Sequence, residues 1–434
     1  MFSIRGLWNH IVTAWQMVGM MVIILVVLDL IAAPFVYFHE KRQKERQQAV
    51  RAAQYDGAKW ALGMFREQDA LLKSGRLDVW HAYDYWTAVP YKGKYFNIDS
   101  DGLRRTFNQT ARAAAPAERP FRIFVFGGST LFGLGARDDY TIPSFLAKDL
   151  SKDGIHNVEV FNYGQPGYSS TQEVISLLLQ LKRGNIPDLV IFCDGVNDTV
   201  AAYQDGAAGL TLQEYNRARE FNILNPQLPA KRVALYTAAL LTFVNANALG
   251  KLMRAAMLDL ARPLYERIHG WLPYNRSKSE GGMKPYWAIV ASREIANGLP
   301  HQVVETYAKN MRLVEQAGKD AGFKSVFYWQ PVIYSKSPLS DFEKETVLDS
   351  ELTYAGLDRL MAATYADVRQ AAMADGAGID LHDISDVLND EKSCFWDPWH
   401  ITETCDAVVA ARIEKNVLPI VAPEEKSGHI QRLR

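Results

Sequence analysis

The chain has 434 residues, 48% hydrophobic and 22% charged, which is enough for one large globular domain with additions or for two domains. Its 48 basic and 49 acidic residues give a formal net charge of −1, which argues against a nucleic-acid-binding protein, since such proteins usually carry a basic patch. Three cysteines are too few for a disulfide scaffold, and none has Cys-x-x-Cys spacing. We therefore expect no metal and no cofactor.

The N-terminal segment is predicted to span a membrane. Residues 11–38 contain one charged residue, Asp29, and about 20 apolar residues are enough for a helix to cross a bilayer. Aromatic residues lie near both ends of the run, as they do at membrane interfaces: Trp15, Tyr37 and Phe38. The run is longer than the apolar part of a cleaved signal peptide and ends in YFHEKRQKER. Residues 1–40 are therefore expected to be an uncleaved anchor, rather than a signal peptide or a buried core helix.

Residues 41–119 are predicted to be a juxtamembrane helix and a linker. The first half is charged and rich in Ala, Gln and Arg, as in a surface helix, and the second half is aromatic and irregular. It ends in ARAAAPAERP, which has the composition of a linker or a domain edge.

A series of short apolar runs then predicts an α/β domain. The runs do not alternate with polar residues, which is typical of parallel strands buried on both faces. They cover residues 122–128, 158–164, 188–195, 324–331 and 379–383. Helical patterns lie between them, such as 169–184, where Ser169, Ser170 or Thr171 could cap the helix. This alternation predicts a three-layer α/β/α sandwich with a five-stranded, mainly parallel sheet. We expect residues 120–204 and 300–415 to form it, and 416–434 to be a C-terminal tail.

The interval 205–299 interrupts this pattern and is predicted to be a helical insertion. It is rich in Ala, Leu and Tyr, and Val233–Gly250 is uncharged, so a second membrane span has to be considered. Two asparagines, Asn245 and Asn247, weaken that interpretation. The two interpretations that remain are a lid, which could contact lipid, and a packed structural insertion.

Four segments that follow predicted strands carry candidate catalytic residues. In FVFGGSTLFG, Ser129 follows Gly127 and Gly128 on a turn after a strand, which is where parallel sheets bind ligands. In NYGQPGYSS, Gly164 and Gly167 could bring backbone N–H groups close to a substrate oxygen. Taken alone, either segment is more simply explained as a turn or a helix cap.

The third segment, DGVNDT, contains Asn197, whose amide could stabilise an oxyanion. Asp198 and Thr199 in the same segment are also good helix-capping residues.

The fourth segment, FWDPWHITETC, places Asp397 three residues before His400, so that one loop could present both. A serine nucleophile needs a histidine base, and that histidine needs an acceptor to fix its tautomer. The sequence has no third ligand at metal spacing beside Asp397 and His400, which argues against a zinc site. His382 is a rival base, although its IDLHD setting is typical of a strand. Trp396 and Trp399 flank Asp397 and could bind a sugar ring or an acyl chain, or could simply pack.

Together these four segments resemble the blocks of the SGNH hydrolases, also called GDSL esterases or lipases, over about residues 95–205 and 300–415. Ser129 matches the first block, Gly167 the second, Asn197 the third, and Asp397 with His400 the fourth. The first block departs from the family pattern, because Gly128 stands where GDS has Asp, and this puts the esterase label in more doubt than the nucleophile.

The resemblance implies a flavodoxin-like SGNH fold and a catalytic triad of Ser129, Asp397 and His400. The oxyanion hole would consist of the N–H groups of Ser129 and Gly167 and the Asn197 amide. The implied function is a membrane-anchored esterase that acts on an O-acyl ester, such as one of a cell-envelope glycan or lipid. The same residues would serve an O-acetyltransferase, and a non-catalytic accessory subunit with this fold is the other alternative.

Two observations predict opposite orientations in the membrane. Four basic residues follow the span (Lys41, Arg42, Lys44 and Arg46) and only Arg5 precedes it, which places the large C-terminal part in the cytoplasm. Singly anchored relatives usually face outward, and a disulfide between Cys394 and Cys405 would need an oxidising compartment. Two free cysteines are the alternative. We favour a bacterial inner-membrane protein with an extracytoplasmic domain; the oligomeric state cannot be read from the sequence.

Overall fold

The structure is a computed structural model that describes residues 4–107, 119–214, 217–218, 247–248, 251–252, 295, 297–373 and 379–427. The chain divides into two compact units, Met1–Gln47 with Asn216–Met283 and Gln48–Tyr215 with Lys284–Arg434. Nearly all of the insertion predicted over 205–299, including the uncharged run Val233–Gly250, lies outside the described residues.

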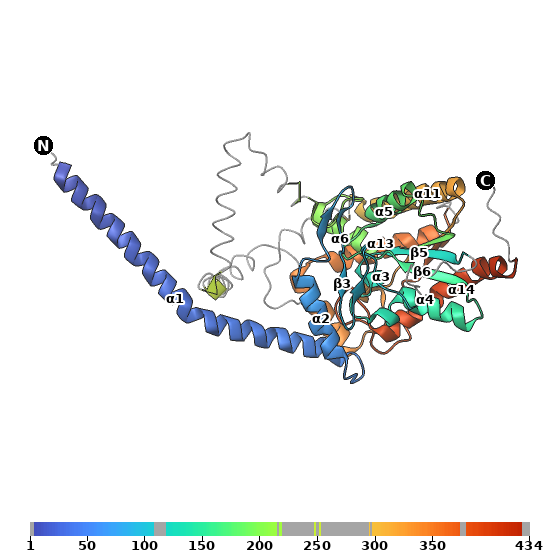
Figure 1. The fold of residues 1–434 in the computed structure, drawn as a ribbon, viewed down its shortest axis with the longest axis horizontal. Coiled ribbons are helices and arrows are strands. Elements are labelled where there is room, and N and C mark those ends of the chain that lie inside the picture. Colours follow the sequence, from blue (N-terminus) through green and yellow to red (C-terminus); the bar gives the residue numbers. More distant parts are fainter. Residues whose placement is uncertain are drawn as a thin grey trace. The chain divides into compact units, whose positions relative to one another are not determined.

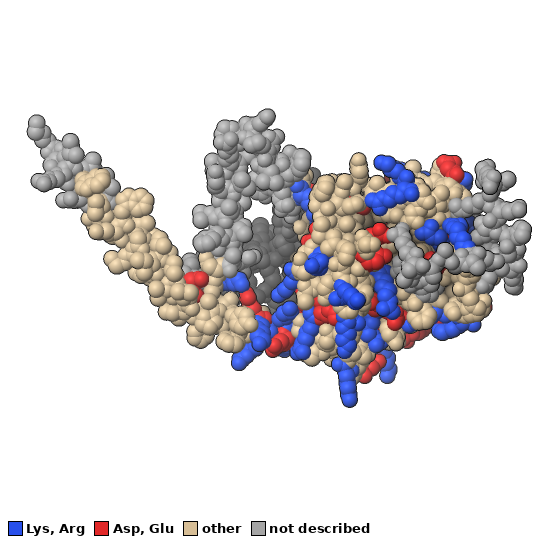
Figure 2. Space-filling model, in the orientation of Figure 1, with Lys and Arg blue, Asp and Glu red and all other residues tan. Residues whose placement is uncertain are grey.

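The described part of the first unit is mainly helix α1 (Ile4–Ala53), which continues into the second unit. Large apolar side chains along it are exposed, among them Trp15 and Phe35. Figure 2 shows the described N-terminal part of α1 almost free of charged side chains, which gather toward its other end. Among the described residues, α1 is the helix long and apolar enough to cross a membrane, and a signal sequence would meet the same test.

The second unit is built around a five-stranded sheet with the order β6-β5-β7-β8-β9. All four pairings are parallel, which confirms the predicted parallel sheet. The strands are β5 (Phe121–Gly127), β6 (Val158–Asn162), β7 (Leu189–Asp194), β8 (Lys324–Trp329) and β9 (Leu381–Asp383). The carboxyl ends of β5, β6 and β7 therefore lie at one edge of the sheet, with β5 in the middle.

Helices cover both faces of this sheet (Figure 1). Phe124 and Phe126 of β5 pack in one hydrophobic cluster, under α5 (Ser170–Lys182), α6 (Val196–Asp205), α11 (Leu299–Ala321) and α13 (Leu357–Met373). Ile123 and Val125 point the other way, under α4 (Ile142–Lys152) and α14 (Glu403–Ser427). Because successive side chains of a strand point to opposite faces, apolar residues at every position of β5 build two cores at once. The three-layer α/β/α architecture is confirmed.

Shorter elements complete the unit. They are α3 (Ser129–Phe132), α12 (Asp341–Thr353) and two 3-10 helices, Asp138–Tyr140 and Ile333–Ser335. Helix α14 runs past residue 415, and its Val417 and Val421 are buried in the core. The α/β domain therefore includes about twelve residues that the sequence analysis placed in the tail, because the apolar spacing continues to Val421.

The region predicted to be a juxtamembrane helix and linker has a fold of its own. It contains α2 (Ala61–Lys73) and two short hairpins, β1 (Val79–His81) with β2 (Tyr85–Thr87) and β3 (Tyr91–Lys92) with β4 (Asn97–Ile98). A third hydrophobic cluster joins them to the α/β domain. The guanidinium of Arg104, fully buried, pairs with Asp138 at 3.1 Å and donates to four carbonyl groups around it. Residues 48–107 are thus part of the domain.

Candidate active site

Ser129 lies where the central strand β5 passes into helix α3. Gly128 is the N-cap of that helix and Ser129 is its first residue. A Cβ atom at Gly128 would lie 2.3 Å from the Asn197 Nδ2 atom. The backbone before Ser129 therefore lies so close to the Asn197 amide that residue 128 has no room for a side chain. This contact explains locally why glycine precedes the serine here. The backbone N–H of Ser129, at the first turn of a helix, has no partner within that helix.

His400 connects Ser129 to Asp397. The distance between Ser129 Oγ and His400 Nε2 is 2.8 Å, and that between His400 Nδ1 and Asp397 Oδ2 is 2.6 Å. With its proton on Nδ1, the imidazole donates to Asp397 and accepts the hydroxyl proton of Ser129. Ser129 and His400 are 271 residues apart in the chain. The structure thus brings together the three residues expected to form a triad.

Asp397 is held in place by the loop on which it lies. Its Oδ1 atom accepts the backbone N–H groups of Trp399, at 2.8 Å, and of His400, at 2.7 Å. Its other oxygen is thereby directed to the imidazole. A disulfide between Cys394 and Cys405 closes the loop that contains both Asp397 and His400, which we name the His400 loop (residues 394–405).

A buried glutamate, Glu343 of α12, anchors the start of the His400 loop. It accepts the backbone N–H groups of Cys394 at 2.8 Å and Phe395 at 3.1 Å, and it pairs with the buried Lys336 ammonium. Burial opposes the charge of Glu343, but the hydrogen bonds from Cys394, Ser340 and Phe395 hold the pKa of its carboxyl below the ordinary value. The sequence analysis missed Glu343, because nothing in its helical setting marks a contact with a loop 51 residues away.

Besides Ser129, the two residues expected in the oxyanion hole are Gly167, in the loop after β6, and Asn197, in the helix after β7. Asn197, in the first turn of α6, donates its amide to the carbonyl of Tyr168 at 2.7 Å. Gly167, the residue before Tyr168, has a φ of +81°, which favours glycine. The carbonyl that Asn197 binds thus belongs to the residue after Gly167. Asp198 accepts the hydroxyl and the N–H of Ser170, and it also hydrogen-bonds the backbone of Gly195, the N-cap of α6.

The β6–α5 loop (residues 163–169), which carries Gly167, is held by the β1–β2 hairpin. Trp86 donates its indole N–H to the carbonyl of Pro166 at 2.9 Å, and the Tyr168 hydroxyl donates back to the carbonyl of Trp86. The Gln165 side chain accepts from Ala88 N at 2.9 Å and donates to Gly102 O at 3.0 Å. These contacts were missed because the hairpin strands are three residues long and show no alternation.

Two carboxylic acids are buried at the base of the β7–α6 turn. Glu173 is fully buried, and its carboxyl group is hydrogen-bonded to that of Asp194. Burial raises the pKa of Glu173 well above its ordinary value, and the nearby charge of Asp194 adds to this. Burial likewise raises the pKa of Asp194. Two buried carboxyl groups in contact are costly when both are charged, so Glu173 is expected to hold a proton near neutral pH.

The two tryptophans expected to contact substrate differ in their surroundings. Trp396 is only 6% exposed and packs edge-on against Phe65, with its ring stacked on His400. This burial argues against a substrate-binding role for Trp396, because the indole lies in the core and packs on the histidine. Trp399 is partly buried, against Tyr334 and Tyr354, and its contact with substrate stays a prediction.

His382, the rival base, is not part of this arrangement. Its ring stacks on Tyr328, and its nitrogens face Asp380 and Asn416. Among the residues that the structure describes, no group of three or more His, Cys, Asp or Glu side chains could hold a metal ion.

No protein-family model and no curated protein match the chain. Solved structures that are similar to it include an acetyl xylan esterase (14% identity, covering 68% of this chain and 99% of that one, TM-score 0.33). A member of the lipolytic G-D-S-L family from Veillonella parvula has 12% identity, coverage of 67% and 94%, and a TM-score of 0.32. A putative acylhydrolase from Bacteroides fragilis has 11% identity, coverage of 71% and 92%, and a TM-score of 0.33. These likenesses are distant, so the function proposed below rests on side-chain geometry.

Proposed function

We propose that this protein is a membrane-anchored serine esterase of the SGNH type, with Ser129 as nucleophile, His400 as base and Asp397 as the residue that orients the base. The observation that carries the proposal is the pair of short contacts through one imidazole, from Ser129 to His400 and from His400 to Asp397. A serine hydroxyl becomes a competent nucleophile when a histidine oriented in this way removes its proton. The chain order Ser, Gly, Asn, Asp and His supports the SGNH assignment.

The reaction begins when Ser129 Oγ attacks the carbonyl carbon of an ester and passes its proton to His400 Nε2. The carbonyl oxygen becomes an oxyanion. The N–H groups of Ser129 and Gly167 and the amide of Asn197 are the donors for it, each worth about 2.7–4 kcal/mol to the transition state. The intermediate collapses by breaking the bond to the alcohol oxygen, which takes the proton from His400 and leaves. The acyl group is now on Ser129.

In the second half of the reaction a hydroxyl group removes the acyl group from Ser129. When water is the acceptor, His400 takes one proton from it, the bond between the acyl carbon and Ser129 Oγ breaks, Oγ takes the proton back from His400, and a free carboxylic acid leaves. When the acceptor is a sugar hydroxyl, the same steps move the acyl group to that sugar. The triad serves both outcomes, so an O-acyltransferase is the second candidate function.

The natural substrate is proposed to be an O-acyl ester of a cell-envelope glycan or lipid, reached from the outer side of a membrane in which α1 is the anchor. The Cys394–Cys405 disulfide supports the outward orientation, because structural disulfides persist in oxidising compartments. The basic residues after the apolar run, Lys41 and Arg42 among them, argue for the opposite orientation.

Hydrolysis of p-nitrophenyl acetate and butyrate by the full-length protein in detergent micelles tests the esterase. We expect turnover by the wild type and by the control Ser151→Ala, whose serine lies on α4, and none above background by Ser129→Ala. Turnover by Ser129→Ala equal to that of the wild type would contradict the proposal. A wild-type protein that folds but does not turn over would favour the non-catalytic accessory subunit.

A second experiment separates hydrolysis from transfer. The protein is incubated with acetylated xylo-oligosaccharide and an excess of unacetylated oligosaccharide of a different length. An esterase releases acetic acid, whereas a transferase yields the second oligosaccharide with an added acetyl group, which mass spectrometry distinguishes.

Protease digestion of spheroplasts tests the orientation. The large domain should be degraded while a cytoplasmic marker stays intact. Degradation only after the membrane is lysed would place the domain in the cytoplasm.

A further inference from the structure

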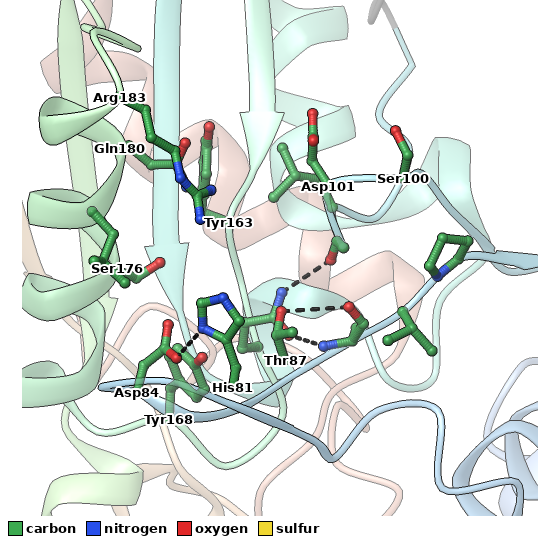
Figure 3. A pocket seen from close by; sticks show the side chains of 17 residues that line it. His81, Asp84, Thr87, Ser100, Asp101, Tyr163, Tyr168, Ser176, Gln180 and Arg183 are labelled. Atoms are coloured by element: carbon green, nitrogen blue, oxygen red, sulfur yellow. Dashed lines mark hydrogen bonds and ion pairs between the residues drawn. The ribbon is translucent and has the colours of Figure 1, made fainter.

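A polar cavity of about 320 Å³ lies beside the β6–α5 loop, between that loop, the β1–β2 hairpin, the turn after β4 and one face of α5 (Figure 3). Its volume is in the range of small-molecule sites, which is about 300–1,000 Å³. Ser129, His400 and Asp397 do not line it, so it is a site separate from the triad.

The walls of the cavity offer both donors and acceptors. Ser176, Gln180 and Arg183 have the spacing of one helix face, and Figure 3 shows them on the α5 side, across from Ser100 and Asp101. Within the described part of the chain, the Arg183 guanidinium has no carboxylate partner.

His81 also lines the cavity, and its Nδ1 atom is paired with the buried Asp84. This pairing fixes the imidazole ring and leaves Nε2 for another group; among the described residues Nε2 makes no hydrogen bond.

This lining fits a sugar better than an acyl chain. A hydroxyl group is both donor and acceptor, so a ring with several hydroxyls needs mixed partners of the kind that Ser176, His81 Nε2 and Arg183 provide. An acyl chain in the same place would leave these polar groups without partners, which costs free energy for each group that is desolvated.

Two residues of the cavity wall belong to the loop that carries Gly167. Gln165 and Tyr168 line the cavity and flank Gly167 in the β6–α5 loop. The carbonyl of Tyr168 accepts the amide of Asn197, the expected oxyanion donor. A ligand that contacts Gln165 or Tyr168 therefore contacts the loop that positions two of the three oxyanion donors.

We propose that this cavity is an accessory subsite for one sugar residue of a glycan, and that it selects acylated glycan over acylated lipid as the substrate class of Ser129. The subsite rests on the proposed esterase function for its role, although sugar binding can be measured without any turnover. Its occupancy holds the β6–α5 loop in the conformation that presents Gly167 and Asn197 to the oxyanion.

Saturation-transfer NMR and calorimetry with xylotetraose and chitotetraose test this proposal on the full-length protein in micelles. We expect at least one of the two to bind the wild type. Arg183→Ala, which removes an exposed side chain, and Ser176→Trp, which fills the cavity, should each weaken binding at least ten-fold. Lys182→Ala is the matched control, since Lys182 is an exposed neighbour on α5 that does not line the cavity, and it should bind as the wild type does.

Turnover of p-nitrophenyl acetate is measured on the same variants. It should stay within about two-fold of the wild type in Lys182→Ala, whose side chain does not line the cavity. Binding of neither oligosaccharide, or equal binding by the wild type, Arg183→Ala and Ser176→Trp, would overturn the subsite. Oligosaccharide binding without any turnover would instead contradict the esterase and leave the sugar site standing.

Discussion

The indole ring of Trp396 is stacked on the imidazole ring of His400, with ring centroids 5.0 Å apart and an angle of 12° between the planes. The other neighbours of Trp396 are Phe65 of α2 and the guanidinium of Arg51, at the end of α1. His400, the proposed base, therefore packs against a residue that itself contacts the segment following the N-terminal apolar run.

Trp396→Leu is expected to lower kcat roughly ten-fold, because the lost stacking both loosens His400 and removes the aromatic face that stabilises an imidazolium, an effect of about 1–2 kcal/mol. KM should change little, since Trp396 is buried and does not face the substrate. Trp396→Phe keeps an aromatic ring and should recover most of the loss. Equal kcat values for the wild type and Trp396→Leu with p-nitrophenyl acetate would show that the stacking has no role.

Asn197→Ala is expected to lower kcat by about 10²–10³-fold, as removal of one oxyanion donor does in other serine hydrolases. The loss should fall mainly on kcat, because the oxyanion forms only in the transition state. Asn416→Ala, on α14 beside His382, is the control and should keep full activity. A rise in KM with an unchanged kcat would remove Asn197 from the oxyanion hole.

Replacing Cys394 and Cys405 together by serine is expected to destabilise the protein by about 2–4 kcal/mol, the usual contribution of a disulfide that closes a short loop. Activity should fall as well, because the same loop carries Asp397 and His400. Urea unfolding with and without dithiothreitol measures the effect. The reductant should lower the midpoint of the wild type and leave the double variant unchanged; a wild type that is insensitive to reductant would argue against the disulfide.

Glu173→Gln is expected to change the pH dependence of stability. Because burial raises the pKa of Glu173 in the folded state, the stability linked to its proton is fully present below the ordinary carboxyl pKa of 4.5 and is lost as pH rises. Glutamine mimics the protonated acid. The variant should therefore melt close to the wild type near pH 4.5 and roughly 2–8 °C above it at pH 8. The exposed control Glu345→Gln should follow the wild type, and a Glu173→Gln protein less stable than the wild type at pH 8 would contradict a protonated Glu173.

The parts of the molecule that depend on local pattern could be predicted from the sequence. Strand β7 is apolar at nearly every position because both of its faces are buried, and Ser129 and Asn197 directly follow strands at the same edge of the sheet. Contacts between distant segments could not be predicted. Trp86 and Pro166 are 80 residues apart, and no periodicity marks a three-residue strand that holds a loop.

The orientations of the two tryptophans beside Asp397 could not be predicted from the sequence either. Sequence alone gives Trp396 and Trp399 equivalent positions around Asp397. The isolated bridge between Phe395 and Ile401 and the packing of Phe65 turn Trp396 into the core, and Trp399 lies against Tyr334 instead. Which of two aromatic residues faces substrate is decided by tertiary packing.

Covalent labelling with a fluorophosphonate tests the central claim most directly, because this reagent phosphonylates a serine only where a base has activated it. Tryptic mass spectrometry of the labelled full-length protein should find the adduct on Ser129. Labelling should be lost in Ser129→Ala and strongly slowed in His400→Asn, while Ser151→Ala labels as the wild type does. An unlabelled wild type, or labelling that persists at the same rate in Ser129→Ala, would contradict the proposal that Ser129 is the nucleophile.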